Sequence, residues 1–269
     1  MRSPDQKTEK APKLEVHGHR GSRSTHPENT FAAFEEAFSS GANAFELDTQ
    51  LTSDGEVIVF HDFELSARVC RKNGQPPLGP MEILRTMWSE VNQWDVGSVV
   101  QAKYLRQKLS VQKIPTLDSA LKWVKGKPAP FYVNVEVKAA PEWPDALVDT
   151  YTAKVIRLIQ NYGLENRCLL MSFDFRVIRA AKKNMPALRS SCLFENAADF
   201  VMVAKQNGAT QIGPHFSLLT EALVKETQSA GLRVMPWTVN APEDWARLKR
   251  WGVDGIITDS PRELIQFLT

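Results

Sequence analysis

The segment AFELDTQLTSDGEVIVFHD, residues 44–62, sets the topology of the rest of the chain. It contains two strand-like stretches, residues 44–51 and 56–62, with only the residues TSDG between them. A crossover between parallel strands needs about a dozen residues or more, so these two stretches cannot be consecutive parallel strands. Asp54-Gly55 is a typical hairpin-turn signal. The segment therefore predicts one parallel strand followed by an antiparallel arm that folds back on it.

On both sides of this hairpin, strand-like stretches alternate with amphipathic helical ones. The nine strand-like stretches are residues 14–19, 44–51, 56–62, 131–138, 168–173, 189–194, 210–216, 233–240 and 254–259. Helical patterns cover residues 29–40, 117–124, 145–163, 175–184, 199–208, 221–231, 242–252 and 261–268. This alternation predicts a parallel sheet covered by helices. Without the hairpin arm, the remaining strands suffice for an α/β fold of the (β/α)8 TIM barrel type. A doubly wound open sheet is the alternative.

The alternation breaks at residues 62–115, which contain GQPPLGP and many polar residues. In a barrel this stretch is an insertion after the second strand, on the face where active sites are built. Trp88 and Trp94 need burial, which favours a small subdomain or lid over a disordered loop. We expect a single barrel domain over residues 1–269, with residues 1–13 as a polar N-terminal leader.

Composition excludes several classes of protein. The 33 basic residues nearly balance the 31 acidic ones, and a net charge of +2 argues against a nucleic-acid partner. The three cysteines form neither a zinc pattern nor a disulfide framework. No apolar run is long enough for an integral membrane segment, and the N-terminus lacks the apolar core of a signal peptide. We expect a cytoplasmic protein; the alternative is a periplasmic or secreted one whose signal was removed. Nothing in the sequence sets an oligomeric state.

Acidic residues fall on the inward faces of two predicted neighbouring strands. Residues two apart share a face of a strand, which pairs Glu46 with Asp48 and places Glu136 beside Lys138. Barrel interiors are normally apolar, and buried like charges repel unless a cation compensates them. Oxygen ligands without cysteine suit one divalent metal ion, Mg²⁺ or Ca²⁺. The alternative is that each acid caps a loop or pairs with Arg20 or Lys138.

Two histidines are predicted to flank this acidic cluster. His19 ends the first strand, and the hairpin folds His61 back toward the strand at residues 44–51. Two imidazoles beside a metal, with Arg20 and Lys138 available for an anion, favour general acid–base chemistry on a phosphate. One imidazole takes a proton from the nucleophile while the other gives one to the leaving oxygen. Gly21 permits a sharp turn after His19 and Arg20.

The chain contains five motifs in this order: HRGSRSTHPENT (19–30), ELDTQLTSDGEVIVFHD (46–62), NVEVK (134–138), WTVN (237–240) and GIITDSP (255–261). In this order, from Val16 to Pro261, the chain resembles the glycerophosphodiester phosphodiesterase family. The resemblance implies that His19 and His61 are the catalytic pair. It implies that the metal ligands are Glu46, Asp48 and Glu136, and that the substrate-binding residues are Arg20, Lys138 and Trp237. For Trp237, packing inside the barrel is an equally weighted alternative.

The expected activity is metal-dependent hydrolysis of a small-molecule glycerophosphodiester to sn-glycerol 3-phosphate and an alcohol. A substrate hydroxyl next to the phosphate offers a second route, through a cyclic phosphate. The alternative is a lysophospholipase D or sphingomyelinase D-like enzyme acting on lipids, which predicts an exposed apolar rim on residues 62–115, where Trp88 and Trp94 sit. A non-catalytic phosphodiester-binding barrel would require the loss of a key residue. An unrelated metal-dependent barrel enzyme, such as an isomerase, would not need the second histidine.

Two further polar residues are assigned to helix capping. Asn29 is expected to cap the helix that follows it. Asp259, just before Ser260-Pro261, is expected to cap the last helix.

Overall fold

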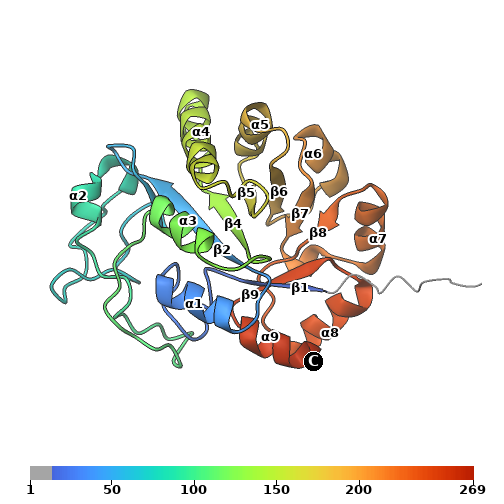
Figure 1. Ribbon diagram of the computed structural model, residues 1–269, viewed down its shortest axis with the longest axis horizontal. Coiled ribbons are helices and arrows are strands. Elements are labelled where there is room, and N and C mark those ends of the chain that lie inside the picture. The colour runs from blue at the N-terminus through green and yellow to red at the C-terminus, as the bar shows by residue number, and fades with distance from the viewer. Residues whose placement is uncertain (1–13) are drawn as a thin grey trace, which may run out of the picture.

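Eight parallel strands form a barrel in the computed structural model, which describes residues 14–269 and leaves the leader predicted for residues 1–13 outside (Figure 1). The strands are β1 (Glu15–Gly18), β2 (Ala44–Leu51), β4 (Tyr132–Val137), β5 (Cys168–Ser172), β6 (Arg189–Phe194), β7 (Gln211–Pro214), β8 (Arg233–Val234) and β9 (Gly255–Thr258). Their order is β8-β7-β6-β5-β4-β2-β1-β9. Backbone hydrogen bonds join the two ends, from Asp254 N to Val234 O (3.1 Å) and from Ile257 N to Pro236 O (3.0 Å). The TIM barrel is confirmed, and the open-sheet alternative is wrong.

The ninth strand, β3 (Val57–Val59), is the predicted hairpin arm. It pairs antiparallel with β2, with Thr49 opposite Val59 and Leu51 opposite Val57. Gly55 forms the turn at a φ of +81°, a conformation that glycine adopts without steric cost. The hairpin directs the chain after β3 back along β2.

Eight helices of the described chain surround the barrel, with their apolar faces against the strands (Figure 1). They are α1 (Phe31–Ser39), α3 (Leu117–Lys125), α4 (Asp145–Asn161), α5 (Phe175–Asn184), α6 (Phe200–Gln206), α7 (Glu221–Ser229), α8 (Pro242–Trp251) and α9 (Pro261–Leu268). A short 3-10 helix, Phe216–Leu218, follows β7. Within residues 14–269, no helix combines the length and the apolar character needed to cross a bilayer.

The segment between β3 and α3 forms an extension beside the barrel, on the left in Figure 1, and carries the 3-10 helix η1 (Ile83–Arg85) and the short helix α2 (Trp88–Val91). It has a hydrophobic cluster of its own, which includes Phe60, Leu65 and Trp94. Trp94 is buried and Trp88 packs against this cluster. Neither tryptophan therefore forms an exposed rim of the kind that the lipid alternative predicts.

Candidate active site

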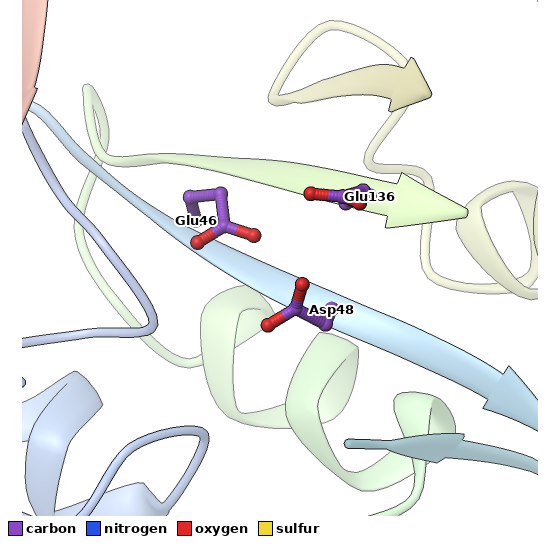
Figure 2. A group of neighbouring side chains, drawn as sticks. All are labelled: Glu46, Asp48 and Glu136. Carbon is purple, nitrogen blue, oxygen red and sulfur yellow. The ribbon is translucent and has the colours of Figure 1, made fainter. Parts of the chain in front are cut away.

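Three carboxylates gather inside the barrel, toward the carboxyl ends of β2 and β4. Strand pairing places Asp48 directly opposite Glu136, and Glu46 lies two residues earlier on the same face of β2 (Figure 2). One oxygen from each of the three lies within 4.8 Å of the others, and all three residues are buried. The predicted acidic cluster is present in the structure.

The electrostatics of this cluster favour a bound cation. Burial raises the pKa of Glu46 well above its ordinary value, and the charges of Asp48 and Glu136 add to the shift. One carboxylate oxygen of Glu46 accepts a hydrogen bond from the Arg20 amide (2.9 Å), but the other, Oε1, is buried with no protein partner. A buried oxygen left without a partner among like-charged neighbours fits a hard divalent ion with oxygen ligands. The residues present therefore fit the metal that the sequence predicts.

Two cations lie against the same carboxylates. Lys138 Nζ is 2.6 Å from Glu136 Oε1 and 3.3 Å from Asp48 Oδ1, while Arg20 Nε is 3.1 Å from Asp48 Oδ2. Burial alone would raise the pKa of Asp48, but these positive charges hold it well below its ordinary value. Pairing with Arg20 and Lys138 therefore accounts for the burial of Asp48 and Glu136. It does not account for Glu46 Oε1, which has no protein partner.

Each of the two predicted histidines is held by a carboxylate. His19 Nδ1 lies 2.7 Å from Asp259 Oδ1, and His61 Nδ1 lies 2.7 Å from Asp62 Oδ1. Both rings line the same cavity, and among residues 14–269 neither Nε2 has a protein hydrogen-bond partner. A carboxylate on one ring nitrogen fixes the tautomer and leaves the other nitrogen for a ligand. The arrangement therefore provides two oriented imidazoles in one pocket.

The two histidines differ in their surroundings. Burial lowers the pKa of His19 below its usual value, and the charge of Arg20 adds to this, although the bond to Asp259 opposes the shift. His61 stands at the end of the hairpin arm and is more exposed, with 33% of its side-chain surface open against 13% for His19. The neutral form of His19 is thus favoured near neutral pH.

The turn after His19 depends on glycine. Arg20 has a φ of +50° and Gly21 a φ of +87°. A Cβ on Gly21 would lie 2.6 Å from the carbonyl carbon of Ala33 in α1. The close approach of this loop to α1 allows the Arg20 amide to reach Glu46, while the Arg20 side chain reaches Glu28 at 2.9 Å.

The opposite wall of the cavity is apolar. The cavity has a volume of about 340 Å³. Trp237 lines it and donates from Nε1 to Gly213 O (2.7 Å), and the Phe173 ring meets it edge-on at 5.3 Å. Trp237 therefore both packs against the barrel and faces the cavity. All eight predicted site residues lie together here, seven in the cavity wall and Asp48 behind Arg20 and Lys138.

Two residues predicted to cap helices have other partners. Thr30, not Asn29, caps α1, and Asn29 instead donates from Nδ2 to Asp48 Oδ2 (2.9 Å). Asp259 does not cap α9, because Ser260 occupies the N-cap without a side-chain bond. The two predictions failed because they used only the residues next in sequence, which favour a cap. The observed partners, Asp48 for Asn29 and His19 for Asp259, lie far away along the chain.

Several residues that support the site carry no local signal at all. Arg68 contacts both Glu28 (3.1 Å) and Asp62 (3.2 Å), and Tyr104 donates to Asp259 Oδ2 (2.8 Å). Both come from the segment between β3 and α3. His17, two residues before His19, contacts Glu15 and Asn134 inside the barrel.

Comparison with known proteins agrees with this geometry. Residues 19–263 match the glycerophosphoryl diester phosphodiesterase family. A glycerophosphodiester phosphodiesterase from Caldanaerobacter subterraneus is 32% identical, over 94% of this chain and 97% of its own. A structure from Silicibacter pomeroyi, described as a putative glycerophosphoryl diester phosphodiesterase, superimposes with a TM-score of 0.89 at 29% identity, covering 95% of this chain and 92% of its own.

A further solved structure shares the fold. It is an Oleispira antarctica phosphodiesterase in complex with the product sn-glycerol-3-phosphate, with a TM-score of 0.80 at 23% identity, covering 94% of this chain and 96% of its own. The family match begins at His19, directly after β1, and spans the other seven strands of the barrel. The chain therefore belongs to the glycerophosphoryl diester phosphodiesterase family.

Proposed function

We propose that this protein hydrolyses small-molecule glycerophosphodiesters to sn-glycerol 3-phosphate and an alcohol, using His19 and His61 as the acid–base pair. One observation carries the proposal: both imidazoles line a single cavity together with Glu46, Glu136 and the cations Arg20 and Lys138. The family match and the product named for the Oleispira antarctica neighbour support the substrate class.

His19 is the proposed general base. Its lowered pKa leaves the imidazole neutral near pH 7, so Nε2 accepts the proton of the attacking oxygen. As the new P–O bond forms, the bond from phosphorus to the alcohol oxygen breaks. His61 Nε2 donates its proton to that oxygen, and the Asp62 carboxylate stabilises the imidazolium before transfer.

Arg20 and Lys138 are proposed to bind the phosphoryl oxygens, whose negative charge grows during the displacement. Glu46, Asp48 and Glu136 would hold Mg²⁺ or Ca²⁺. Such an ion, when bound, supplies positive charge that polarises the phosphoryl group. Trp237 and Phe173 offer the apolar wall against which the carbon atoms of the substrate pack.

The test is ³¹P NMR of glycerophosphocholine incubated with the protein, with Mg²⁺ or Ca²⁺ and then with EDTA. We expect a growing glycerol 3-phosphate signal that EDTA abolishes. A persistent cyclic phosphate signal would mean that the adjacent substrate hydroxyl attacks and that hydrolysis is not the reaction. Absence of turnover with either metal would refute the proposed substrate class.

A second candidate is a lysophospholipase D or sphingomyelinase D-like reaction at the same histidine pair. One observation favours it: Val100, Leu105 and Val111 are exposed aliphatic side chains in the segment between β3 and α3. Release of choline from lysophosphatidylcholine but not from glycerophosphocholine would select this candidate.

A further inference from the structure

A loop that packs against the β1–α1 connection has an unusual composition. No acidic residue stands between Asp95 and Asp118, while four basic residues do: Lys103, Arg106, Lys108 and Lys113. The whole chain carries a net charge of only +2, so positive charge is concentrated here. The side chains of all four basic residues are exposed.

The loop has a closed neck and a tip of its own. Val96 N donates to Gln112 O (2.8 Å) and Ser110 N donates to Gly97 O (3.1 Å), which brings the two ends together. A Cβ on Gly97 would lie 2.1 Å from Ser110 O, so the neck is tight. Residues 97–110 thus form a compact Ω-type loop, a class of loop that frequently carries function. Residues 111–113 continue directly from its neck and are included in the loop.

Large aliphatic side chains lie exposed among the basic ones. The exposed fractions are 67% for Val100, 77% for Leu105 and 72% for Val111. A single exposed leucine needs no explanation, but three such side chains within twelve residues, interleaved with cations, do. The loop combines apolar contact groups with positive charge.

Contacts from the middle of the loop fix it beside the β1–α1 connection. Tyr104, unlike the exposed side chains around it, is buried and donates to Asp259, the carboxylate that holds His19. Lys108 N donates to Thr25 O (2.8 Å), and Gln107 Nε2 donates to Arg23 O (2.7 Å), both in the connection from β1 to α1. The exposed side chains therefore stand on the side of the barrel where the cavity opens.

The cations of the loop are weakly paired. Lys103 Nζ lies 3.9 Å from Asp259 Oδ2, and Arg106 Nη2 lies 4.0 Å from Glu263 Oε1. Within residues 14–269, Lys108 has no ion-pair partner. Their charge remains available to an external anion.

We propose that residues 97–113 dock the protein on an anionic phospholipid bilayer, with the cavity facing the membrane. Basic side chains are attracted to the negative surface potential of anionic lipids, and the aliphatic ones enter the headgroup region. An acidic protein surface would satisfy the cations but would leave three aliphatic side chains exposed to water, so a bilayer fits both features. The docking site is separate from the catalytic residues and does not depend on which diester is cleaved.

The test is co-sedimentation with vesicles of phosphatidylcholine alone and of an equal mixture with phosphatidylglycerol. We expect binding only to the mixed vesicles, weakened as salt rises above about 0.15 M. Arg106→Gln with Lys108→Gln should lower the partition coefficient about 25-fold, because each basic side chain contributes about fivefold. The matched control is Lys249→Gln with Arg250→Gln, which removes the same charge from the far end of α8 and should leave binding almost unchanged.

A second pair of variants tests the apolar contribution. Leu105→Ser should weaken binding to the mixed vesicles, whereas Met202→Ser, at an exposed methionine on α6, should not.

Equal loss in the loop variants and their controls would overturn the proposal, as would no binding to anionic vesicles at low salt. A concentration-dependent dimer that Leu105→Ser abolishes, without vesicle binding, would assign the loop to self-association instead. Turnover of soluble glycerophosphocholine by the loop variants should match the unmodified protein, so failure of the proposed reaction is a distinct outcome.

Discussion

Neighbouring charges shift the pKa values of two carboxylates in this site in opposite directions. Glu46 and Asp48 lie two residues apart on β2, yet the pKa of Glu46 is raised and that of Asp48 is lowered. Glu46 is desolvated beside two carboxylates, whereas Asp48 contacts Arg20 and Lys138. Residue type alone does not predict that the two carboxylates have pKa shifts of opposite direction.

The proposed roles of the two histidines predict different responses to the leaving group. His61→Ala should lower turnover of glycerophosphocholine by about 10²–10⁴-fold, because the alcohol then leaves unprotonated. It should retain most activity on a p-nitrophenyl phosphodiester, whose leaving group needs no proton. His19→Ala should lose activity on both substrates. Steady-state kinetics with both substrates measures this, and equal losses on the two substrates in His61→Ala would contradict the assignment.

Asp259 should act through His19. Asp259→Asn leaves the shape intact but removes the charge that favours the protonated imidazole, so the pKa of His19 should fall further. The acid limb of kcat/KM should move to lower pH, and kcat should fall by about 10²–10⁴-fold as the tautomer is lost. The control is Asp199→Asn at the N-cap of α6, which should change stability alone. An unmoved acid limb in Asp259→Asn would argue against the link to His19.

Glu46→Gln should stabilise the metal-free protein while it weakens metal binding. The raised pKa of folded Glu46 means that stability in EDTA falls as pH rises above the unfolded value of 4.5. Glutamine removes this dependence and should raise the unfolding free energy at pH 7 by roughly 1–3 kcal/mol. Urea denaturation at several pH values tests this, with exposed Glu226→Gln as the control. Lower stability of Glu46→Gln in EDTA would refute the repulsion argument.

At the scale of elements, the β1–α1 turn and the β2–β3 hairpin deliver the two histidines that we propose as the acid–base pair. The turn presents His19 and Arg20, and the hairpin returns His61 to the same cavity. Both turns use glycine at positive φ, but Gly21 is also packed against α1, whereas Gly55 is not confined by backbone. The first turn is therefore the less tolerant of substitution.

Gly21→Ala and Gly231→Ala separate backbone strain from steric conflict. Both glycines have positive φ, +87° and +79°, but only at Gly21 would a Cβ meet another atom within 4 Å. Gly231→Ala should cost about 1–2 kcal/mol, and Gly21→Ala about 2–5 kcal/mol, since overpacking adds to the strain. Urea unfolding midpoints measure the difference. Equal costs would mean that α1 shifts freely to accommodate the methyl group.

At the scale of the whole molecule, the acidic cluster joins β2 to β4 in the wall of a closed barrel. A metal ion held there binds only the folded chain, so its binding free energy adds to global stability.

Metal should therefore raise the melting temperature of the whole protein. At a free concentration 100 times the Kd the gain is about 2.7 kcal/mol, which corresponds to roughly 5–10 °C for a domain of this size. Calorimetric melting with Mg²⁺, Ca²⁺ and EDTA measures the shift. Glu136→Gln should reduce it, and an unchanged shift in that variant would remove Glu136 from the ligand set.

The sequence by itself determined the alternation of strands and helices and the β2–β3 hairpin, because strand and helix periodicities and the four-residue hairpin connection are local properties. Closure into a barrel, as opposed to an open sheet, was decided by the tertiary structure, in which β8 and β9 are joined by backbone hydrogen bonds. It also placed the acids, cations and histidines at strand ends, since the two-residue repeat of a strand fixes which side chains share a face. Only the tertiary structure decided that Asp259 holds His19 across 240 residues of sequence, that Tyr104 supports Asp259, and that Asn29 contacts Asp48. These contacts join segments that become neighbours only when the barrel closes, so no local pattern encodes them. Glu46 and Asp48 are both buried, and the charged neighbours that shift their pKa values in opposite directions likewise meet them only in the folded molecule.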